Sequence, residues 1–517
     1  MIVGDWLGRR EQYTPEKIAL IDTIHANREI SYRDWSRSVN RTGRFLIDRL
    51  GVKKGDRVAV LSYNNVEYLD LWFALGRVGG ILQNLNWRLT PFELAGLVAD
   101  AEPVVLVYGP EFIPAVRQLR ENSNSVRHFV AMVEKDRPED LRISERDGCA
   151  DAPLPEIDLG WDDPWVICYT GGTTGLPKGA ILTHRAITAN AVNTVVSWDL
   201  DSHDIAVLNS PLFHTGGLNV FTAPMVEIGG TTILCKSFDP DQTFDLIRDM
   251  NVTLFFGVPT MFLMLQQHPR WAEADFSRLK LVINGGAACP LPIFEKFWER
   301  GIDFKTGYGL TEAGPNTFLL PRKDVRRKPG AVGFPLLHVD VKLVREDGSR
   351  CAPNEVGELL IRGPHMFAGY WNKPEETAKT VIDGWLHTGD LAVCDEEGYY
   401  TIMGRLKDMI ISGGENVYPA EIESTLHDHP AVAAAALIGI PDAKWGEVGR
   451  AIVVLHKGKT ASAEELSAYL RTRLAGFKVP KSIVFVDALP LTGAGKIDKK
   501  ALEIRYGAPQ SEEKQIE

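Results

Sequence analysis

The stretch Tyr-Thr-Gly-Gly-Thr-Thr-Gly-Leu-Pro-Lys-Gly occupies residues 169–179. It follows a short apolar run, Trp165 to Cys168, and precedes another, Ala180 to Leu182, which predicts a flexible loop between two buried strands. The glycines allow backbone N–H groups to turn toward an anion, the threonines add hydroxyl donors, and Lys178 adds a positive charge. The loop is therefore a candidate polyphosphate site.

Two well-known phosphate-binding motifs do not describe this loop. Lys178 stands between Pro177 and Gly179, so the Gly-Lys-Ser/Thr ending of a P-loop is absent, and so is the Gly-x-Gly-x-x-Gly dinucleotide fingerprint. Taken alone, a loop of this composition is more often a glycine-rich surface turn. The choice between the two interpretations depends on the rest of the chain.

Length and composition limit the possibilities. A chain of 517 residues predicts two or more domains, and 44% hydrophobic with 24% charged residues is typical of a globular protein. The formal charge of −11 argues against a nucleic-acid partner, because phosphate backbones require a cationic face. Any site for a polyanion must therefore be local.

The cysteines and the apolar segments favour a cytoplasmic protein. The six cysteines are scattered, so neither a zinc site nor a disulfide framework is indicated. The first residues lack a basic region followed by an apolar core, so we expect no secretory signal. Residues 205–226 carry no charge, but prolines, glycines and polar residues interrupt them, which favours a pocket wall over a transmembrane helix.

Alternating strand-like and helical runs predict doubly wound α/β sheets up to about residue 404. We expect helices at 32–50, 69–78, 240–250 and 290–300, and strands at 57–62, 103–107, 205–208, 231–235, 253–258 and 280–284. The polar segment 134–163 is expected to be a solvated connector. Beyond residue 404, helices at 419–427 and 463–474 and strands at 434–438 and 451–454 are enough for a second, small core.

Two further segments carry residues suited to a nucleotide. Tyr308-Gly-Leu-Thr-Glu312 follows the Gly285-Gly-Ala287 turn, and Thr388-Gly-Asp390 comes later. A tyrosine ring suits a purine, a threonine hydroxyl suits a phosphate, one carboxylate suits Mg²⁺ and another suits the ribose hydroxyls. Each segment alone is equally compatible with a buried turn or a cap.

Taken together and in order, these segments resemble the motifs of the adenylate-forming superfamily, which holds acyl-CoA synthetases, firefly-type luciferases and amino-acid-activating domains. The resemblance extends to Gly404–Ile410, similar to the hinge motif, and to Pro490–Ile497, similar to the adenylation-lysine loop. It is closest to stand-alone fatty-acyl-CoA synthetases, notably over 412–423. Gly171 and Ala494 depart from the pattern, since relatives often carry hydroxyl residues there.

The resemblance implies a large N-terminal domain, 1–406, made of several subdomains with doubly wound sheets. It also implies a small mobile α+β C-terminal domain, 407–505, that swings about Lys407, and we expect 506–517 to be a polar tail. The implied reaction has two steps. A carboxylate attacks the α-phosphorus of MgATP and releases pyrophosphate, and the acyl-adenylate then reacts with the thiol of coenzyme A and releases AMP.

The resemblance also assigns residues to each ligand. Lys496, Glu312, Thr311 and His214 are the implied catalytic residues, Glu312 and Thr174 the implied Mg²⁺ ligands, and Lys407 the hinge. The implied ATP and AMP contacts are Thr170, Gly171, Gly172, Thr173, Thr174, Gly175, Lys178, Gly286, Ala287, Tyr308, Gly309, Thr311, Asp390, Arg405 and Lys496. The implied coenzyme A contacts are Gly413, Gly414, Arg88, Trp445, Phe477 and Lys481.

The acid is expected in an apolar pocket formed by Phe213, His214, Gly217, Leu218, Phe221, Val258, Pro259, Phe262, Gly286 and Gly309. Because Gly216, Gly217 and Gly314 leave room, we favour a medium- or long-chain fatty acid over an aryl acid of the benzoate or cinnamate type. A luciferase-like oxygenase and a carrier-protein acyl-AMP ligase are also compatible with the resemblance, because fold alone does not determine function. A basic run at 322–328 allows peripheral membrane contact, although a solvated loop is the simpler interpretation, and a homodimer is compatible with the sequence.

Overall fold

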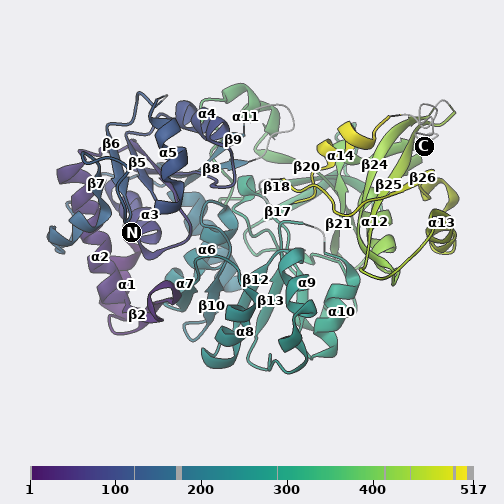
Figure 1. Ribbon diagram of the computed structural model, residues 1–517, viewed down its shortest axis with the longest axis horizontal. Helices are drawn as coiled ribbons and strands as arrows, with labels where there is room; N and C mark the ends of the chain where they lie inside the picture. Colours follow the sequence, from purple (N-terminus) through teal and green to yellow (C-terminus); the bar gives the residue numbers. More distant parts are fainter. Residues whose placement is uncertain are drawn as a thin grey trace.

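The computed structural model describes residues 3–121, 123–170, 177–287, 289–412, 415–442, 444–492 and 496–508. Within these residues, a large N-terminal domain carries two seven-stranded sheets and a five-stranded sheet, and a smaller C-terminal domain carries another five-stranded sheet. Figure 1 shows the C-terminal domain at the right-hand end of the molecule. This mixed α/β architecture confirms the predicted fold class. The predictions for residues 171–175, 413, 414, 494 and 509–517 lie outside the described residues.

The first large sheet has the strand order β7-β6-β5-β3-β4-β8-β9. Its pairs are parallel except for the antiparallel pair β8 and β9, which flank the glycine-rich loop as the sequence predicted. Its strands are β3 (Arg57–Leu61), β4 (Ile81–Asn84), β5 (Val105–Tyr108), β6 (His128–Ala131), β7 (Leu141–Arg142), β8 (Pro164–Thr170) and β9 (Lys178–Thr183).

The second large sheet has the order β14-β13-β12-β10-β11-β1-β2 and is parallel apart from the edge pair β1 and β2. The carboxyl ends of β10, β12, β13 and β14 lie at one edge, where ligands of open α/β sheets collect. Its strands are β1 (Ile18–Asp22), β2 (Arg28–Ser31), β10 (Ile205–Leu208), β11 (Thr231–Leu234), β12 (Leu254–Gly257), β13 (Leu281–Asn284) and β14 (Phe304–Thr306).

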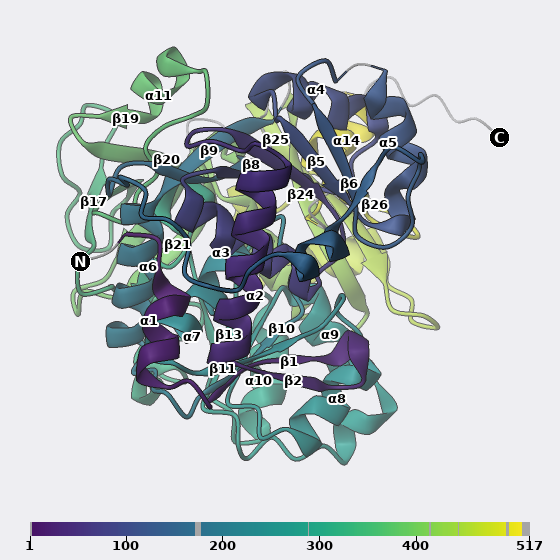
Figure 2. The same cartoon turned by 90° about the vertical axis from the view of Figure 1, so that its left-hand side faces the viewer.

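Helices pack against both sheets, as α2 and α3 illustrate in Figure 2. Ser31 caps α2 (Tyr32–Arg44) and Asn65 caps α3 (Val66–Val78), each by accepting a bond from a backbone N–H in the first turn. The other helices of this domain are α1 (Trp6–Tyr13), α4 (Pro91–Ala101), α5 (Ile113–Arg120), α6 (His184–Ser197), α7 (Thr222–Ile228), α8 (Pro240–Asp249), α9 (Pro259–Gln267), α10 (Leu291–Glu299) and α11 (Pro374–Thr380).

A cluster of buried aromatic rings joins these helices to the first sheet. The indole N–H of Trp165, on β8, donates to the carbonyl of Trp72 on α3 at 2.7 Å, and both rings are fully buried. The ring of His184 stacks on Trp165 with centroids 4.8 Å apart. Burying each such side chain contributes about 2 kcal/mol or more. The strand that leads into the glycine-rich loop is therefore rigidly anchored.

The third sheet is antiparallel and links the two domains. Its individual strands were not predicted from the sequence. It contains β17 (Asp340–Val344), β18 (Val356–Arg362), β19 (Val381–Ile382), β20 (Trp385–Cys394) and β21 (Tyr400–Arg405), and β15 (Phe318–Leu319) pairs with β16 (Phe334–Pro335) nearby. Thr388-Gly-Asp390 therefore lies within a strand and not in the turn or cap that the sequence alone allowed.

The C-terminal sheet has the order β23-β22-β25-β24, and β26 pairs with β25. Its elements are β22 (Ile410–Ser412), β23 (Glu415–Val417), α12 (Pro419–His427), β24 (Val432–Asp442), β25 (Gly446–Leu455), α13 (Ala463–Arg471), β26 (Ser482–Phe485) and α14 (Lys499–Tyr506). Apolar side chains from α12, α13 and the sheet form a core of their own. The predicted small second core is thus present.

One polar segment differs from what the sequence led us to expect. The segment 134–163 is not simply a solvated connector, because β7 joins the first sheet and Arg146 is buried against Asp70, with Nη1 2.7 Å from Oδ2. In the basic run at 322–328, Arg322, Arg327 and Lys328 form ion pairs, for example Lys328 with Asp395 at 2.6 Å. In the part of the chain that the structure describes, no helix is long and apolar enough to span a bilayer.

We predict an acid-sensitive fold because of two buried histidines. Burial lowers the pKa of His184 and of His365 to about 4. Between that value and the ordinary value near 6.5, the unfolded chain binds more protons than the folded one, so stability falls as the pH falls through this window. Each histidine contributes up to about 1.4 kcal/mol per pH unit.

His184→Phe keeps a ring against Trp165 and removes the titrating group. The free energy of unfolding with urea can be measured at several pH values between 4 and 7. We therefore expect it to fall less steeply with decreasing pH in the variant, and the slope to decrease by the equivalent of about one bound proton. The exposed His203→Gln is the control. An unchanged pH slope in His184→Phe would contradict this explanation.

Candidate functional site

Four loops converge at the carboxyl edge of the second sheet, next to the end of β8. The amide of Asn284, the last residue of β13, donates to the carbonyl of Ala287 at 3.0 Å, and its backbone carbonyl accepts from the N–H of Gly307 at 2.7 Å. These bonds fix the turn at 285–287 against the segment that leads to Tyr308. The structure thereby brings Gly286, Ala287 and Tyr308 together as predicted.

Glu312 lies at the centre of this edge and is 9% exposed. Its Oε1 accepts a bond from the hydroxyl of Tyr370 at 2.8 Å and a longer one from the hydroxyl of Thr170 at 3.5 Å. The carboxylate therefore joins the end of β8 to the loop after β14. Thr170, at the end of β8, and the Tyr308–Glu312 segment, which are far apart in the sequence, therefore meet in one site.

Lys178 lies on the other side of Tyr370. Its Nζ is 5.1 Å from the centre of the Tyr370 ring and 2.5 Å from Oε2 of Glu376 on α11. Neither Tyr370 nor Glu376 was predicted from the sequence. They belong to a segment without a recognisable nucleotide motif, and only folding brings them beside the glycine-rich loop.

Asp390 forms a second charged centre. It faces Arg405 across the antiparallel pair β20 and β21, with Oδ1 2.6 Å from Nε, and its Oδ2 accepts from the hydroxyl of Tyr308 at 2.5 Å. Burial raises the pKa of Asp390, while Arg405 and Tyr308 act in the opposite direction. Burial and Asp390 raise the pKa of Tyr308 well above its ordinary value, so the phenol stays a donor.

Lys496, from the C-terminal domain, reaches this same cleft. Its backbone carbonyl accepts a hydrogen bond from the N–H of Thr492 at 2.7 Å, and its own N–H donates to the hydroxyl of Thr492 at 3.3 Å. Water still reaches the side chain, but protein surrounds it. Burial and Arg405 lower the pKa of Lys496, and the charges of Asp390 and Glu312 act in the opposite direction. The ammonium therefore lies within electrostatic range of both carboxylates.

His214, in the loop after β10, lies within electrostatic range of this ammonium. Burial and the nearby charges of Arg88 and Lys496 lower the pKa of His214 to about 3. Its Nε2 is buried without a hydrogen-bond partner among the described residues, and its ring packs on Phe213 with centroids 4.4 Å apart. His214 therefore lines the site as a neutral ring and does not act as a base at neutral pH.

Four of the predicted acid-pocket residues have other partners. Phe213 packs edge-on against Trp87, Phe221 packs against Trp198, and Phe262 is buried among core rings including Phe304. Leu218 is fully buried in the main core. Val258, Pro259, Gly286 and Gly309 remain at the sheet edge with His214.

Two of the three glycines that were expected to leave room near the acid pocket, Gly217 and Gly314, are in close contact with other atoms, whereas a Cβ at Gly216 would make only ordinary contact with Phe256. A Cβ at Gly217 would lie 2.4 Å from the carbonyl oxygen of Pro211, and one at Gly309 would lie 1.3 Å from that of Pro315. Gly314 has φ +95°, and its Cβ would meet His365. Close backbone approach therefore requires these glycines, whatever the substrate.

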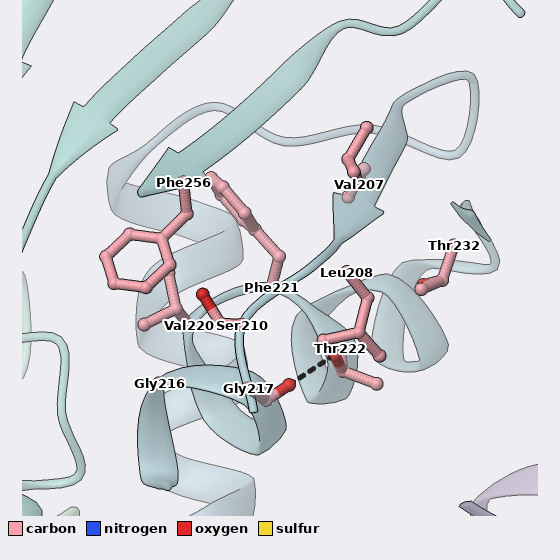
Figure 3. Close-up of a pocket in the computed structure, with 11 residues that line it drawn as sticks. Val207, Leu208, Ser210, Gly216, Gly217, Val220, Phe221, Thr222, Thr232 and Phe256 are labelled. Carbon is pink, nitrogen blue, oxygen red and sulfur yellow. Dashed lines mark hydrogen bonds between the residues drawn. The ribbon is translucent and has the colours of Figure 1, made fainter. Parts of the chain in front are cut away.

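A small cavity lies next to Gly216 and Gly217 and has a volume of ≈ 10 Å³. Figure 3 shows Phe221 and Phe256 on one side of it, and the hydroxyl of Thr222 donating to the carbonyl of Gly217 at 2.6 Å. A space of this size holds about one water molecule. Phe256, one residue before the last of β12, was not predicted as a pocket residue.

The predicted coenzyme A contacts are divided between the two domains. Arg88 lies 4.7 Å from the ring centre of Trp87 and 5.7 Å from that of Phe213, beside His214. Trp445 and Phe477, on the C-terminal domain, are exposed, and Nζ of Lys481 is 5.8 Å from the Trp445 ring. Lys407 is exposed in the short 3₁₀ turn Leu406–Asp408.

The donor set near Glu312 fits a Mg²⁺ ion that enters with a nucleotide. Within the described ranges, no group of three or more His, Cys, Asp or Glu side chains forms a ready metal site. Mg²⁺ is commonly held by one or two carboxylates together with water and substrate phosphates. Glu312, oriented by Tyr370 and Thr170, supplies one such carboxylate, and Thr174 lies outside the described residues.

Family models match most of this chain. Residues 7–371 match the AMP-binding enzyme model, and residues 421–496 match the AMP-binding enzyme C-terminal domain. The chain belongs to the AMP-binding enzyme family. The predicted adenylate-forming superfamily is thereby confirmed, and the protein is an acyl-CoA synthetase.

Relatives and solved structures agree with this assignment. A feruloyl-CoA synthase of Amycolatopsis sp is 42% identical over 98% of this chain and 99% of the relative, and an indoleacetate–CoA ligase of Aromatoleum aromaticum is 38% identical over 96% and 97%. A long-chain-fatty-acid–CoA ligase of Mycobacterium tuberculosis is 34% identical over 98% and 99%. The crystal structure of ATP-bound MatB from Rhodopseudomonas palustris superposes with a TM-score of 0.90 at 33% identity, covering 98% and 99%.

We predict that Gly309→Ala abolishes most of the synthetase activity. The added Cβ would overlap the carbonyl of Pro315, so the loop that carries Thr311 and Glu312 must shift. A displacement of about 1 Å in such a site costs on the order of 10²-fold in rate. Gly148→Ala, where no atom lies within 4 Å of the new Cβ, is the control. ATP–pyrophosphate exchange near the wild-type rate in Gly309→Ala, with a normally folded variant, would show the prediction to be wrong.

Proposed function

We propose that this protein is an AMP-forming CoA ligase that activates an aryl carboxylic acid, in place of the fatty acid that the sequence favoured. The identity to the feruloyl-CoA synthase carries this proposal, and the indoleacetate–CoA ligase supports it. The structure removes one argument for a fatty acid. Gly217 and Gly314 are in close contact with other atoms, so they do not indicate open space for a long chain.

We propose the following roles in binding ATP. The glycine-rich loop and Lys178 hold the β- and γ-phosphates, and the flat ring of Tyr308 packs on the adenine. Asp390 accepts hydrogen bonds from the ribose hydroxyls, with Arg405 holding its carboxylate in place. The hydroxyl of Thr311 contacts the α-phosphate. Glu312 is the carboxylate that would hold Mg²⁺, which offsets phosphate charge when it is bound.

We propose that Lys496 brings the two reactants together in the first step. The charges of Glu312 and Asp390 interact with its ammonium, which also lies within electrostatic range of His214. We place the meeting of the acid carboxylate and the α-phosphate near this ammonium. A cation at this point stabilises the negative charge that develops as the carboxylate oxygen attacks and pyrophosphate departs. The neutral ring of His214 adds no competing charge.

The second step needs a different arrangement of the domains. We propose that, after pyrophosphate leaves, the C-terminal domain rotates about Lys407, which withdraws Lys496 and brings the face around Gly413 and Gly414 to the acyl-adenylate. Arg88, Trp445, Phe477 and Lys481 then contact the nucleotide part of coenzyme A. The whole chain superposes on ATP-bound MatB with a TM-score of 0.90 and on apo MatB with one of 0.81, which supports a change of shape between the two steps. A cytoplasmic location and a homodimer stay predictions.

The acid can be identified by measuring pyrophosphate release with a matched panel. We expect hydroxycinnamic and arylacetic acids to exceed C8 to C16 fatty acids in kcat/KM by at least about tenfold, which corresponds to about 1.4 kcal/mol of differential binding. Release must require ATP, and the thioester must form only when coenzyme A is added. Preference for a fatty acid would favour the long-chain interpretation instead, and product formation with luciferin and oxygen would indicate an oxygenase.

Lys496→Ala tests the two-step scheme. We expect adenylate formation to fall by roughly 10²- to 10³-fold, because a preorganised cation is lost from the developing charge. Thioester formation from supplied acyl-AMP and coenzyme A should change much less. The exposed Lys457→Ala on the same domain is the control. Equal losses in both half-reactions would show that Lys496 does not serve the first step alone.

A further inference from the structure

The ammonium of Lys178 already has an anionic partner within the protein. Its Nζ is 2.5 Å from Oε2 of Glu376, and the two side chains are 27% and 36% exposed. The pair is therefore partly shielded from water. A phosphate oxygen bound to Lys178 would take the position that the Glu376 carboxylate occupies. The ammonium therefore cannot form a close ion pair with the carboxylate and with a phosphate at the same time.

Glu376 also forms an ion pair with a second lysine. Nζ of Lys379, one turn further along α11, lies 2.9 Å from its Oε1. The hydrogen bonds and charges of Lys178 and Lys379 lower the pKa of Glu376 to about 2, so the carboxylate is ionised throughout the physiological range. If Lys178 turns away, Glu376 keeps a partner. The exchange of Lys178 between two anions therefore leaves no carboxylate unpaired.

The position of Glu376 is coupled to the rest of the site through Tyr370. The hydroxyl of Tyr370 donates to Glu312 at 2.8 Å, and its ring lies under Lys178. The N–H of Tyr370 donates to the hydroxyl of Thr377, the next residue on α11, at 2.9 Å. The start of α11 is thus tied to the same segment that orients Glu312, which holds Glu376 within reach of Lys178.

We propose that Glu376 is an internal counter-ion that competes with the phosphates of ATP, and with the departing pyrophosphate, for Lys178. This inference rests on the proposed role of Lys178 as a phosphate contact. When ATP binds, Lys178 turns to the phosphates and Glu376 retains Lys379. After pyrophosphate has formed, Lys178 pairs with Glu376 again, which weakens the binding of pyrophosphate. Glu376 is a positioning residue, since it acts through Lys178.

Calorimetric titration of Glu376→Gln with α,β-methylene-ATP and with pyrophosphate, each with Mg²⁺, tests this without knowledge of the acid. We expect both ligands to bind about two- to fivefold more tightly than to the wild type, as is appropriate for losing a partly exposed ion-pair competitor. Product inhibition by pyrophosphate should strengthen by the same factor. Glu376→Asp, which keeps the charge, should restore most of the wild-type behaviour.

Glu375→Gln is the matched control, because it removes the same charge from the neighbouring exposed position of α11. An equal gain in Glu375→Gln would mean that net charge alone is responsible. Unchanged or weaker binding in Glu376→Gln would mean that Glu376 merely orients Lys178, and either result overturns the proposal.

A Lys178→Ala background separates this proposal from the one on which it rests. The gain from Glu376→Gln must disappear when Lys178 is absent. If Lys178→Ala alone leaves the binding of both ligands unchanged, the role of Lys178 as a phosphate contact is wrong. If Lys178→Ala weakens binding but Glu376→Gln has no effect in the wild-type background, only the competition is wrong.

Discussion

The site depends on the contacts that stabilise two buried carboxyl groups, Glu312 and Asp390. Taking a carboxylate out of water is costly unless hydrogen bonds and opposite charge offset the loss. Asp390 has Arg405 at 2.6 Å and the Tyr308 hydroxyl, and Glu312 has the Tyr370 hydroxyl. Both carboxylates favour the charged form of Lys496, so their charge also draws the C-terminal domain toward the cleft.

Local patterns allowed much of this architecture to be predicted. The strand at 205–208 and the helix at 419–427 agree with the structure at both ends, because a short apolar run and a proline-initiated amphipathic segment define them. The contacts that orient the site could not be predicted. Tyr370 and Glu312 are 58 residues apart, and Lys178 and Glu376 are 198 apart. No periodicity within one segment encodes such a pair.

The acid pocket shows a second limit of sequence reasoning. A glycine in a pocket motif has two physical explanations, space for a ligand or close approach of another backbone. Gly217 and Gly309 belong to the second class, since a methyl group there would overlap the carbonyls of Pro211 and Pro315. Interpreting Gly217, together with Gly216 and Gly314, as free space favoured a long alkyl chain. The distinction depends on which carbonyl faces the glycine, and only the folded chain determines that.

Charge balance explains how an acidic protein binds polyanions. The cleft holds Lys178, Arg405 and Lys496 against Glu312, Glu376 and Asp390, so its own charges nearly cancel. Long-range attraction of nucleotides is therefore weak, which suits a protein of net charge −11. Affinity must come instead from exchanging internal ion pairs for pairs with the ligand. Such exchange gives specificity, because a ligand gains binding free energy only where its own charges pair with the side chains released from the internal ion pairs.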